Sequence, residues 1–68
     1  MNEKLQSLLR MGVKRSGTFC PDEALVGIEE ELTQEEYYTA YNFLDWCWKN
    51  DKTFGWNIAE VYAEYQAA

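Results

Sequence analysis

The sequence predicts an all-α protein, a small compact bundle of three or four short helices around a long central helix at about residues 33–50. Three observations support this fold class. Apolar residues recur at helical spacing, capping residues stand where the helical segments begin, and the aromatic share of 16% can build a compact core. Because 68 residues leave room for one core only, we expect a single helical domain over residues 1–68.

The first predicted helix covers about residues 3–11 and has three leucines on one side. Asn2 stands where an N-cap is expected, and Gly12 stands where a helix commonly stops. Residues 12–20 contain two glycines and two bases without a helical period. We therefore expect a loop there, or at most a short extended pair.

The second predicted helix begins at Pro21, because the first helical position does not need a backbone N–H. Two acids follow in the first turn, where the helix dipole favours negative charge. Leu25, Ile28 and Leu32 form its inward stripe. Gly27 lies inside this helix, where it costs about 1 kcal/mol relative to Ala or permits a close approach by another backbone.

The central helix begins at the strongest local signal in the chain. Thr33 and Glu36 form a capping box, in which each side chain accepts a hydrogen bond from the backbone N–H of the other residue. Leu32 and Tyr37 occupy the two positions of a hydrophobic staple. We expect this helix to continue to about residue 50.

The central helix carries more aromatic residues than one face can hold. At about 100° per residue, six side chains gather in one apolar stripe. They are Tyr37, Ala40, Tyr41, Leu44, Cys47 and Trp48. Phe43 lies at the margin of the stripe, whereas Trp46 falls on the opposite side with Tyr38 and Asn42. This second aromatic edge needs something to cover it.

The last predicted helix follows a break in the pattern at residues 50–53. It begins at either Thr53 or Asn57, and Asn57 opens a sequence similar to a second capping box. Its apolar stripe is clear from residue 58 onward. The stripe consists of Ile58, Val61, Tyr62 and Tyr65. We expect the last two residues to fray.

The net charge of −6 is unevenly distributed along the chain. Residues 1–20 contain four bases and one acid, whereas residues 21–68 contain eleven acids and two bases. An acidic surface repels nucleic-acid phosphates and anionic membranes, and it attracts basic protein surfaces. We therefore expect a partner with a basic surface and no membrane.

The sequence predicts a cytoplasmic protein. No apolar stretch approaches the roughly 20 residues that span a bilayer, and the first residues lack the apolar segment of a secretory signal. In the cytoplasm Cys20 and Cys47 stay reduced, and we expect both to have structural roles.

Catalysis, metal binding and cofactor binding are poorly supported. The chain contains no histidine, which is the usual general base, and no glycine-rich phosphate-binding motif. The three consecutive glutamates at residues 29–31 point to different sides of a helix, so they do not form a metal site. We expect a protein that is not an enzyme, with no cofactor and no metal.

The uncovered aromatic edge instead predicts a non-enzymatic interaction module, an inhibitor or adaptor that occupies a site on a larger protein. Trp and Tyr are enriched among the residues that dominate binding energies, and an acidic rim accelerates association with a basic partner. The predicted partner-binding residues are the anchors Tyr38, Trp46 and Trp56 and the acids Glu29, Glu30, Glu31, Glu35 and Glu36.

Two other arrangements would also cover the aromatic edge. Tyr38 and Trp46 could pack within the chain, under the first helix or the loop at residues 12–20. A homodimer could instead bring two such edges together across a two-fold axis.

The alternative function is related to nucleic acid. The protein would be either a DNA or RNA mimic acting on a nucleic-acid enzyme, or a weak direct binder through Lys4, Arg10, Lys14 and Arg15. The separation of these bases from the aromatic residues along the sequence argues against direct binding. In size and charge alone, the chain resembles the small acidic inhibitors encoded by phages and other mobile elements, including some anti-CRISPR proteins.

Overall fold

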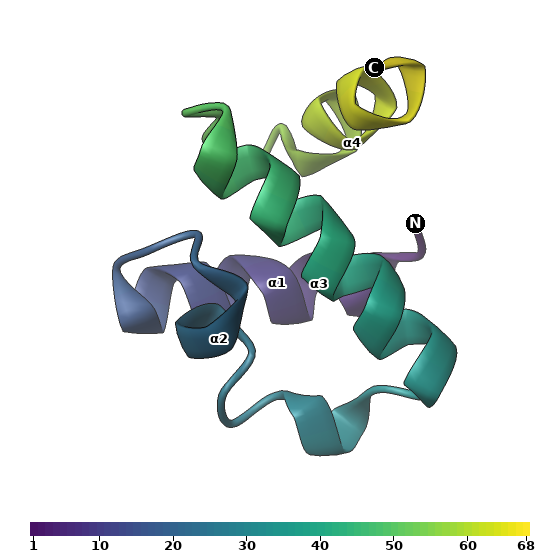
Figure 1. Cartoon of the computed structure of the whole chain (residues 1–68). Coiled ribbons are helices and arrows are strands. Elements are labelled where there is room, and N and C mark those ends of the chain that lie inside the picture. Colours follow the sequence, from purple (N-terminus) through teal and green to yellow (C-terminus); the bar gives the residue numbers. More distant parts are fainter.

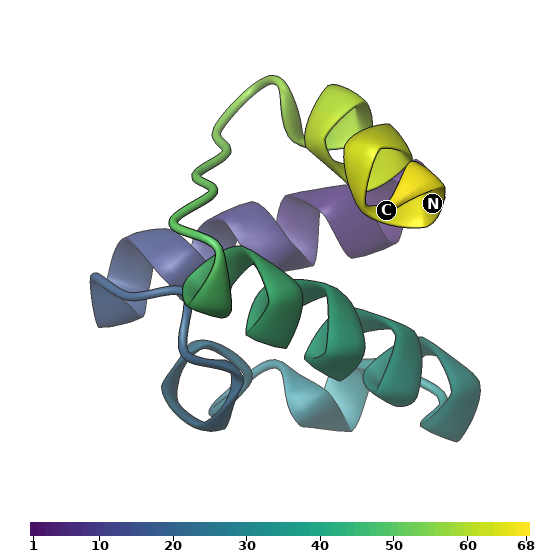
Figure 2. The same cartoon turned by 45° about the horizontal axis from the view of Figure 1, so that its top comes forward.

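Helix α3 crosses the middle of the computed structural model, which describes all 68 residues, and packs against α1, α2 and α4 (Figure 1). The α-helices are α1 (Glu3–Ser16), α2 (Pro21–Ala24), α3 (Gln34–Lys49) and α4 (Ile58–Ala67), and the 3-10 helix η1 is Glu29–Glu31. In Figures 1 and 2, α4 and η1 lie on opposite sides of α3. The all-α prediction is confirmed, since the chain has no strand.

Helix α1 is longer than predicted, and the expected loop at residues 12–20 is wrong over its first half. Gly12 is buried inside the helix, where a Cβ atom would clash with the backbone carbonyl oxygen of Ala24. The helix ends instead at Gly17, whose φ of 74° is left-handed and whose N–H donates to the Val13 carbonyl at 2.8 Å. Gly12 therefore allows α1 and α2 to approach each other closely, and it does not end a helix.

The second helix begins at Pro21, as predicted, but it does not reach residue 32. Gly27 has a φ of 89°, which is incompatible with a continuing helix, and the chain turns there before η1. The Arg15 guanidinium donates hydrogen bonds to the carbonyl oxygens of Ala24 and Val26, so a side chain of α1 supports this turn. Leu25 and Ile28 remain part of the core, whereas Val26 is exposed.

The start of α3 agrees with the prediction. The Glu36 N–H donates to the Thr33 hydroxyl at 3.1 Å, and the Thr33 N–H donates to the Glu36 carboxylate at 2.9 Å. Both residues of the predicted staple, Leu32 and Tyr37, are partly buried against the core. The capping box thus fixes where the central helix begins.

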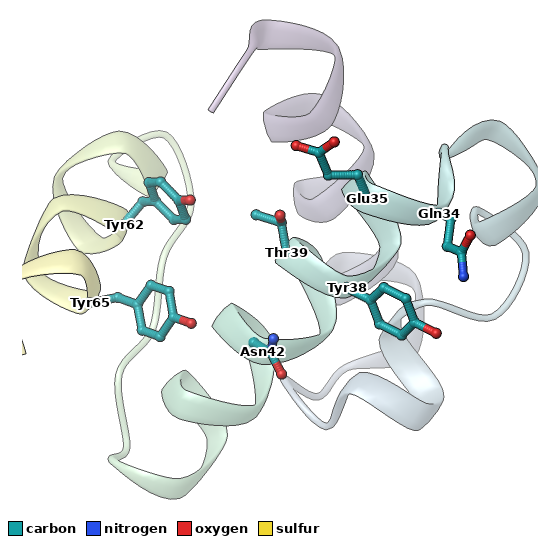
Figure 3. Close-up of a pocket in the computed structure, with 7 residues that line it drawn as sticks. All are labelled: Gln34, Glu35, Tyr38, Thr39, Asn42, Tyr62 and Tyr65. Carbon is teal, nitrogen blue, oxygen red and sulfur yellow. The ribbon is translucent and has the colours of Figure 1, made fainter.

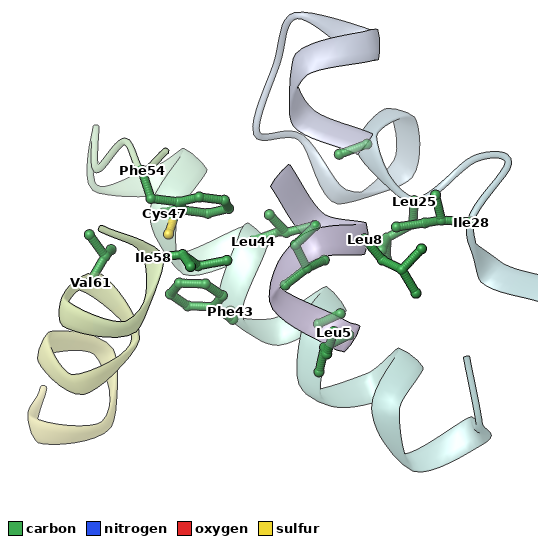
Figure 4. Close-up of a cluster of buried hydrophobic side chains, with 13 residues drawn as sticks. Leu5, Leu8, Leu25, Ile28, Phe43, Leu44, Cys47, Phe54, Ile58 and Val61 are labelled. Atoms are coloured by element: carbon green, nitrogen blue, oxygen red, sulfur yellow. The ribbon is translucent and has the colours of Figure 1, made fainter. Parts of the chain in front are cut away.

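The core contains 13 buried apolar residues, drawn from all four α-helices, the turn between α2 and η1 and the loop before α4 (Figure 4). They are Leu5, Leu8, Leu9, Ala24, Leu25, Ile28, Ala40, Phe43, Leu44, Cys47, Phe54, Ile58 and Val61. The buried face of α3 is therefore rotated about the helix axis relative to the predicted stripe. Phe43 is fully buried rather than marginal, and Trp48 is 52% exposed rather than inward.

The rotation of the buried face has a clear physical cause. Phe43 stacks on Phe54 with ring centroids 5.5 Å apart, and it forms a T-shaped pair with Tyr62 with centroids 5.1 Å apart. Because α4 and the loop before it lie on this side of α3, the residues there are covered, and Trp48 on the other side is not.

Helix α4 begins after Asn57, which was one of the two predicted starts, and continues to Ala67. The Asn57 side chain does not cap the helix; it accepts a hydrogen bond from the Gly55 N–H at 3.0 Å. Both cysteines are free. Burial raises the pKa of the Cys47 thiol to about 12, so this thiol stays neutral in the core.

Candidate functional site

The three predicted aromatic anchors differ in exposure. Trp46 is half-buried and packs against the core, with its ring 5.5 Å from that of Tyr65 on α4. Trp46 is thus covered within the chain, but by α4 and not by α1 or residues 12–20. Tyr38 and Trp56 are exposed, at 57% and 87% respectively.

Tyr38 borders a groove between α3 and α4, which we call the α3–α4 groove (Figure 3). Its volume is about 500 Å³. In Figure 3, Tyr62 and Tyr65 point from α4 toward Thr39 and Asn42 on α3, and Tyr38 projects outward from the far side of α3. The groove therefore offers tyrosine rings, hydroxyl groups and two amide side chains along its length.

The only charged residue that lines the α3–α4 groove is Glu35. Glu35 is exposed and takes part in none of the three ion pairs of the structure. No base lines the groove. The groove thus combines aromatic faces with one unpaired carboxylate, an arrangement that attracts a cation.

The other predicted acidic residues fall into two groups. Glu29, Glu30 and Glu31 are all exposed in η1, which precedes the start of α3. At about three residues per turn, their side chains point in three different directions. They give that end of the molecule a negative surface without forming a cluster.

Glu36 is already engaged inside the protein. Its carboxylate accepts hydrogen bonds from the Thr33 N–H and from the Lys4 ammonium group at 3.1 Å. The Thr33 backbone hydrogen bond, followed by the Lys4 hydrogen bond, lowers the pKa of Glu36 to about 2. Its charge is thus used to join α1 to the start of α3.

Sequence reasoning did not identify Tyr62 and Tyr65 as site residues, because they continue the inward stripe of α4. Both are half-buried, with their rings against Phe43. Their residue type was the available signal, since a tyrosine hydroxyl at the edge of a core usually reaches toward water.

Trp56 lies in a different groove, formed by α1 and the loop before α4. We call this second site the Trp56 groove; its volume is about 580 Å³. Its lining residues include Arg10 and Lys14 of α1 together with Phe54 and Trp56. The structure therefore places two of the predicted anchors, Tyr38 and Trp56, in separate grooves with opposite charge.

Three further findings concern the whole chain. None of the helices has both the length and the apolar character needed to cross a membrane. No group of three or more His, Cys, Asp or Glu residues is arranged to hold a metal ion. Comparison with models of known protein families, with curated proteins and with solved structures finds no match.

Proposed function

We propose that this protein is a non-enzymatic interaction module that binds a basic segment of a larger protein through the α3–α4 groove. The observation that carries this proposal is the combination of two half-buried tyrosines, the exposed Tyr38 at the border and a free carboxylate in a groove without any base. In this role the protein acts as an inhibitor or adaptor that covers a site on its partner. The proposal includes a cytoplasmic setting, in which both cysteines stay reduced.

The chemistry of the groove suits lysine and arginine side chains. The face of a tyrosine ring attracts a cation, with about 0.5–1 kcal/mol at an exposed site and about 2 kcal/mol when water is excluded. The aliphatic stem of the same side chain can pack on the rings of Tyr62 and Tyr65 while its charged end reaches Glu35. One basic side chain can therefore use both features of the groove.

The charge of the protein supports the same partner. The net charge is −6, and the exposed glutamates of η1 lie close in sequence to the start of α3. Such a negative surface raises the rate of encounter with a basic partner, and salt weakens this effect. The groove would then supply the contacts that hold the partner after encounter.

The test uses a short peptide of alternating arginine and glycine as the probe, titrated into ¹⁵N-labelled protein. We expect chemical-shift changes at residues 34–42 and 62–65. Tyr38→Ala combined with Glu35→Gln should weaken binding by about 10-fold, which corresponds to about 1.4 kcal/mol. Both side chains are exposed, so the variant should remain folded.

Trp48→Ala provides a matched control, because it removes an exposed aromatic ring outside the α3–α4 groove. It should leave the peptide affinity unchanged. Equal affinity of the folded double variant and the wild type would refute the proposal, as would shift changes confined to other residues. Sedimentation at two protein concentrations would show whether a second copy of the chain covers the groove instead.

A further inference from the structure

Trp56 is the most exposed large apolar residue of the protein, yet the loop that carries it is firmly anchored. Its neighbour Phe54 is buried, with ring centroids 4.9 Å from Phe19 and 5.5 Å from Phe43. On the other side of Trp56, the Asn57 side chain accepts a hydrogen bond from the Gly55 N–H. The indole ring is thus presented to solvent from a fixed backbone.

Two bases of α1 line the same groove as Trp56. Arg10 and Lys14 are four residues apart, so they share one face of the helix and are separated by about 6 Å along its axis. Neither takes part in any of the three ion pairs of the structure. The Arg10 side chain donates a hydrogen bond only to the Ser7 hydroxyl, at 3.3 Å. Both positive charges are therefore available to a ligand.

The Trp56 groove is positive although the protein as a whole is negative. Its lining residues carry two bases and no acid. In Figures 1 and 2, the loop before α4 and the acidic η1 lie on opposite sides of α3. Charges separated by more than about 8–10 Å are largely screened at physiological salt. Among the residues that line the groove, an anion therefore meets Arg10 and Lys14 and no carboxylate.

We propose that the Trp56 groove binds single-stranded nucleic acid, with one base stacked on Trp56 and neighbouring phosphates held by Arg10 and Lys14. A flat, solvent-facing indole accepts any unpaired base, because every base has a π-face. Because Arg10 and Lys14 lie one helical turn apart on one face of α1, they can each reach a different phosphate of the same strand. The fold thus joins the basic N-terminal segment to an aromatic residue that lies far from it in sequence.

Single-stranded nucleic acid fits these features better than an acidic peptide does. A carboxylate side chain can pair with Arg10 or Lys14, but only a planar ring covers the face of Trp56 efficiently. A duplex fits worse, since its bases are already stacked on one another. The inference is independent of the function proposed for the α3–α4 groove, because the two grooves share no lining residue.

The test measures fluorescence anisotropy of labelled 12-nucleotide oligo-dT and oligo-rU with the full chain at several salt concentrations. For two phosphate contacts, the slope of log K against log salt should be about −1.4. Trp56→Ala should weaken binding by about 5-fold to 150-fold. Arg10→Gln and Lys14→Gln should each bring the slope to about −0.7.

Two matched controls separate this site from general effects. Trp48→Ala removes another exposed tryptophan, from a surface hollow that also contains Asp51. Lys49→Gln changes the net charge as much as Lys14→Gln does, but outside the Trp56 groove. Both variants should bind within about twofold of the wild type. Circular dichroism verifies that each variant is folded.

Several results would overturn the inference. One is binding by Trp56→Ala within twofold of the wild type, and another is equal affinity for a 12-base-pair duplex. Tighter binding of a peptide of alternating aspartate and tryptophan, with the same loss in the variants, would assign the groove to an acidic protein segment instead. The α3–α4 groove variant, Tyr38→Ala with Glu35→Gln, should retain the oligonucleotide affinity, so each proposal can fail alone.

Discussion

Replacement of Gly12 by alanine separates what helix propensity predicts from what the packing of α1 predicts. Considered alone, Gly12→Ala in the interior of a helix should stabilise the protein by about 1 kcal/mol. In the folded protein, however, the added Cβ would collide with the Ala24 carbonyl oxygen and lie 3.4 Å from the Ile28 side chain. Helix propensity therefore predicts a gain in stability for Gly12→Ala, whereas the packing of α1 against α2 predicts a loss.

The atom that the added Cβ would meet belongs to the backbone of Ala24, so a change of side-chain rotamer cannot relieve the clash. The short helix α2 is fixed on both sides, because Pro21 and Leu25 are buried. Overpacking of this kind costs about 3 kcal/mol at the upper end of its range, which exceeds the gain in propensity. We expect a net loss of about 2 kcal/mol, or a fall in Tm of roughly 8–16 °C for a domain of this size.

The assay is urea and thermal unfolding, followed by circular dichroism at helical wavelengths. Gly55→Ala is the matched control, because a Cβ there meets nothing within 4 Å and its φ lies outside the left-handed region. That variant should be neutral or slightly more stable. A Gly12→Ala variant as stable as the wild type would show that α1 and α2 do not approach as closely as described.

Three further predictions test other parts of the fold. Glu36→Gln should lower Tm at pH 7 but have little effect near pH 2. The pKa of Glu36 is about 2 in the folded protein and higher in the unfolded chain, so the stabilisation by the ionised carboxylate is lost as the pH falls from the higher pKa to the lower one. Measurement of Tm across this pH range checks the prediction. Trp46→Ala should cost roughly 2–3 kcal/mol in urea unfolding and Trp48→Ala under about 0.5 kcal/mol, since only Trp46 packs against the core; equal losses would contradict the packing. Iodoacetamide at pH 8 should modify Cys20 first and Cys47 only after unfolding, because the pKa of Cys47 is raised to about 12; peptide mass spectrometry reads the order.

The elements predicted correctly are those set by nearby residues. The start of α3 depends on Thr33 and Glu36, which are one helical turn apart and satisfy each other's backbone groups wherever the helix packs. Pro21 likewise begins a helix for a reason contained in its own ring. The errors at Gly12 and Gly27 share a different origin, because a glycine can end a helix, allow a close contact or form a turn, and only its neighbours in space decide which.

The candidate site was predictable only in part. Tyr38 and Trp56 are exposed, and Glu35 faces a groove, but Trp46 packs inside the chain and Glu36 is held by Lys4. The cover of Trp46 comes from Tyr65 of α4, and the partner of Glu36 comes from α1. A helical wheel gives the angles between side chains along one helix, but it does not say which side another helix will cover.

The sequence by itself determined the all-α class, the beginnings of α2 and α3, and the excess of acidic over basic residues, because caps, helical periodicity and charge are local properties of the chain. Tertiary structure decided which face of α3 is buried, that Gly12 contacts α2, and that Trp56 stands beside Arg10 and Lys14. These features depend on contacts between residues distant in sequence, and such contacts exist only once the helices have packed around Phe43 and its neighbours.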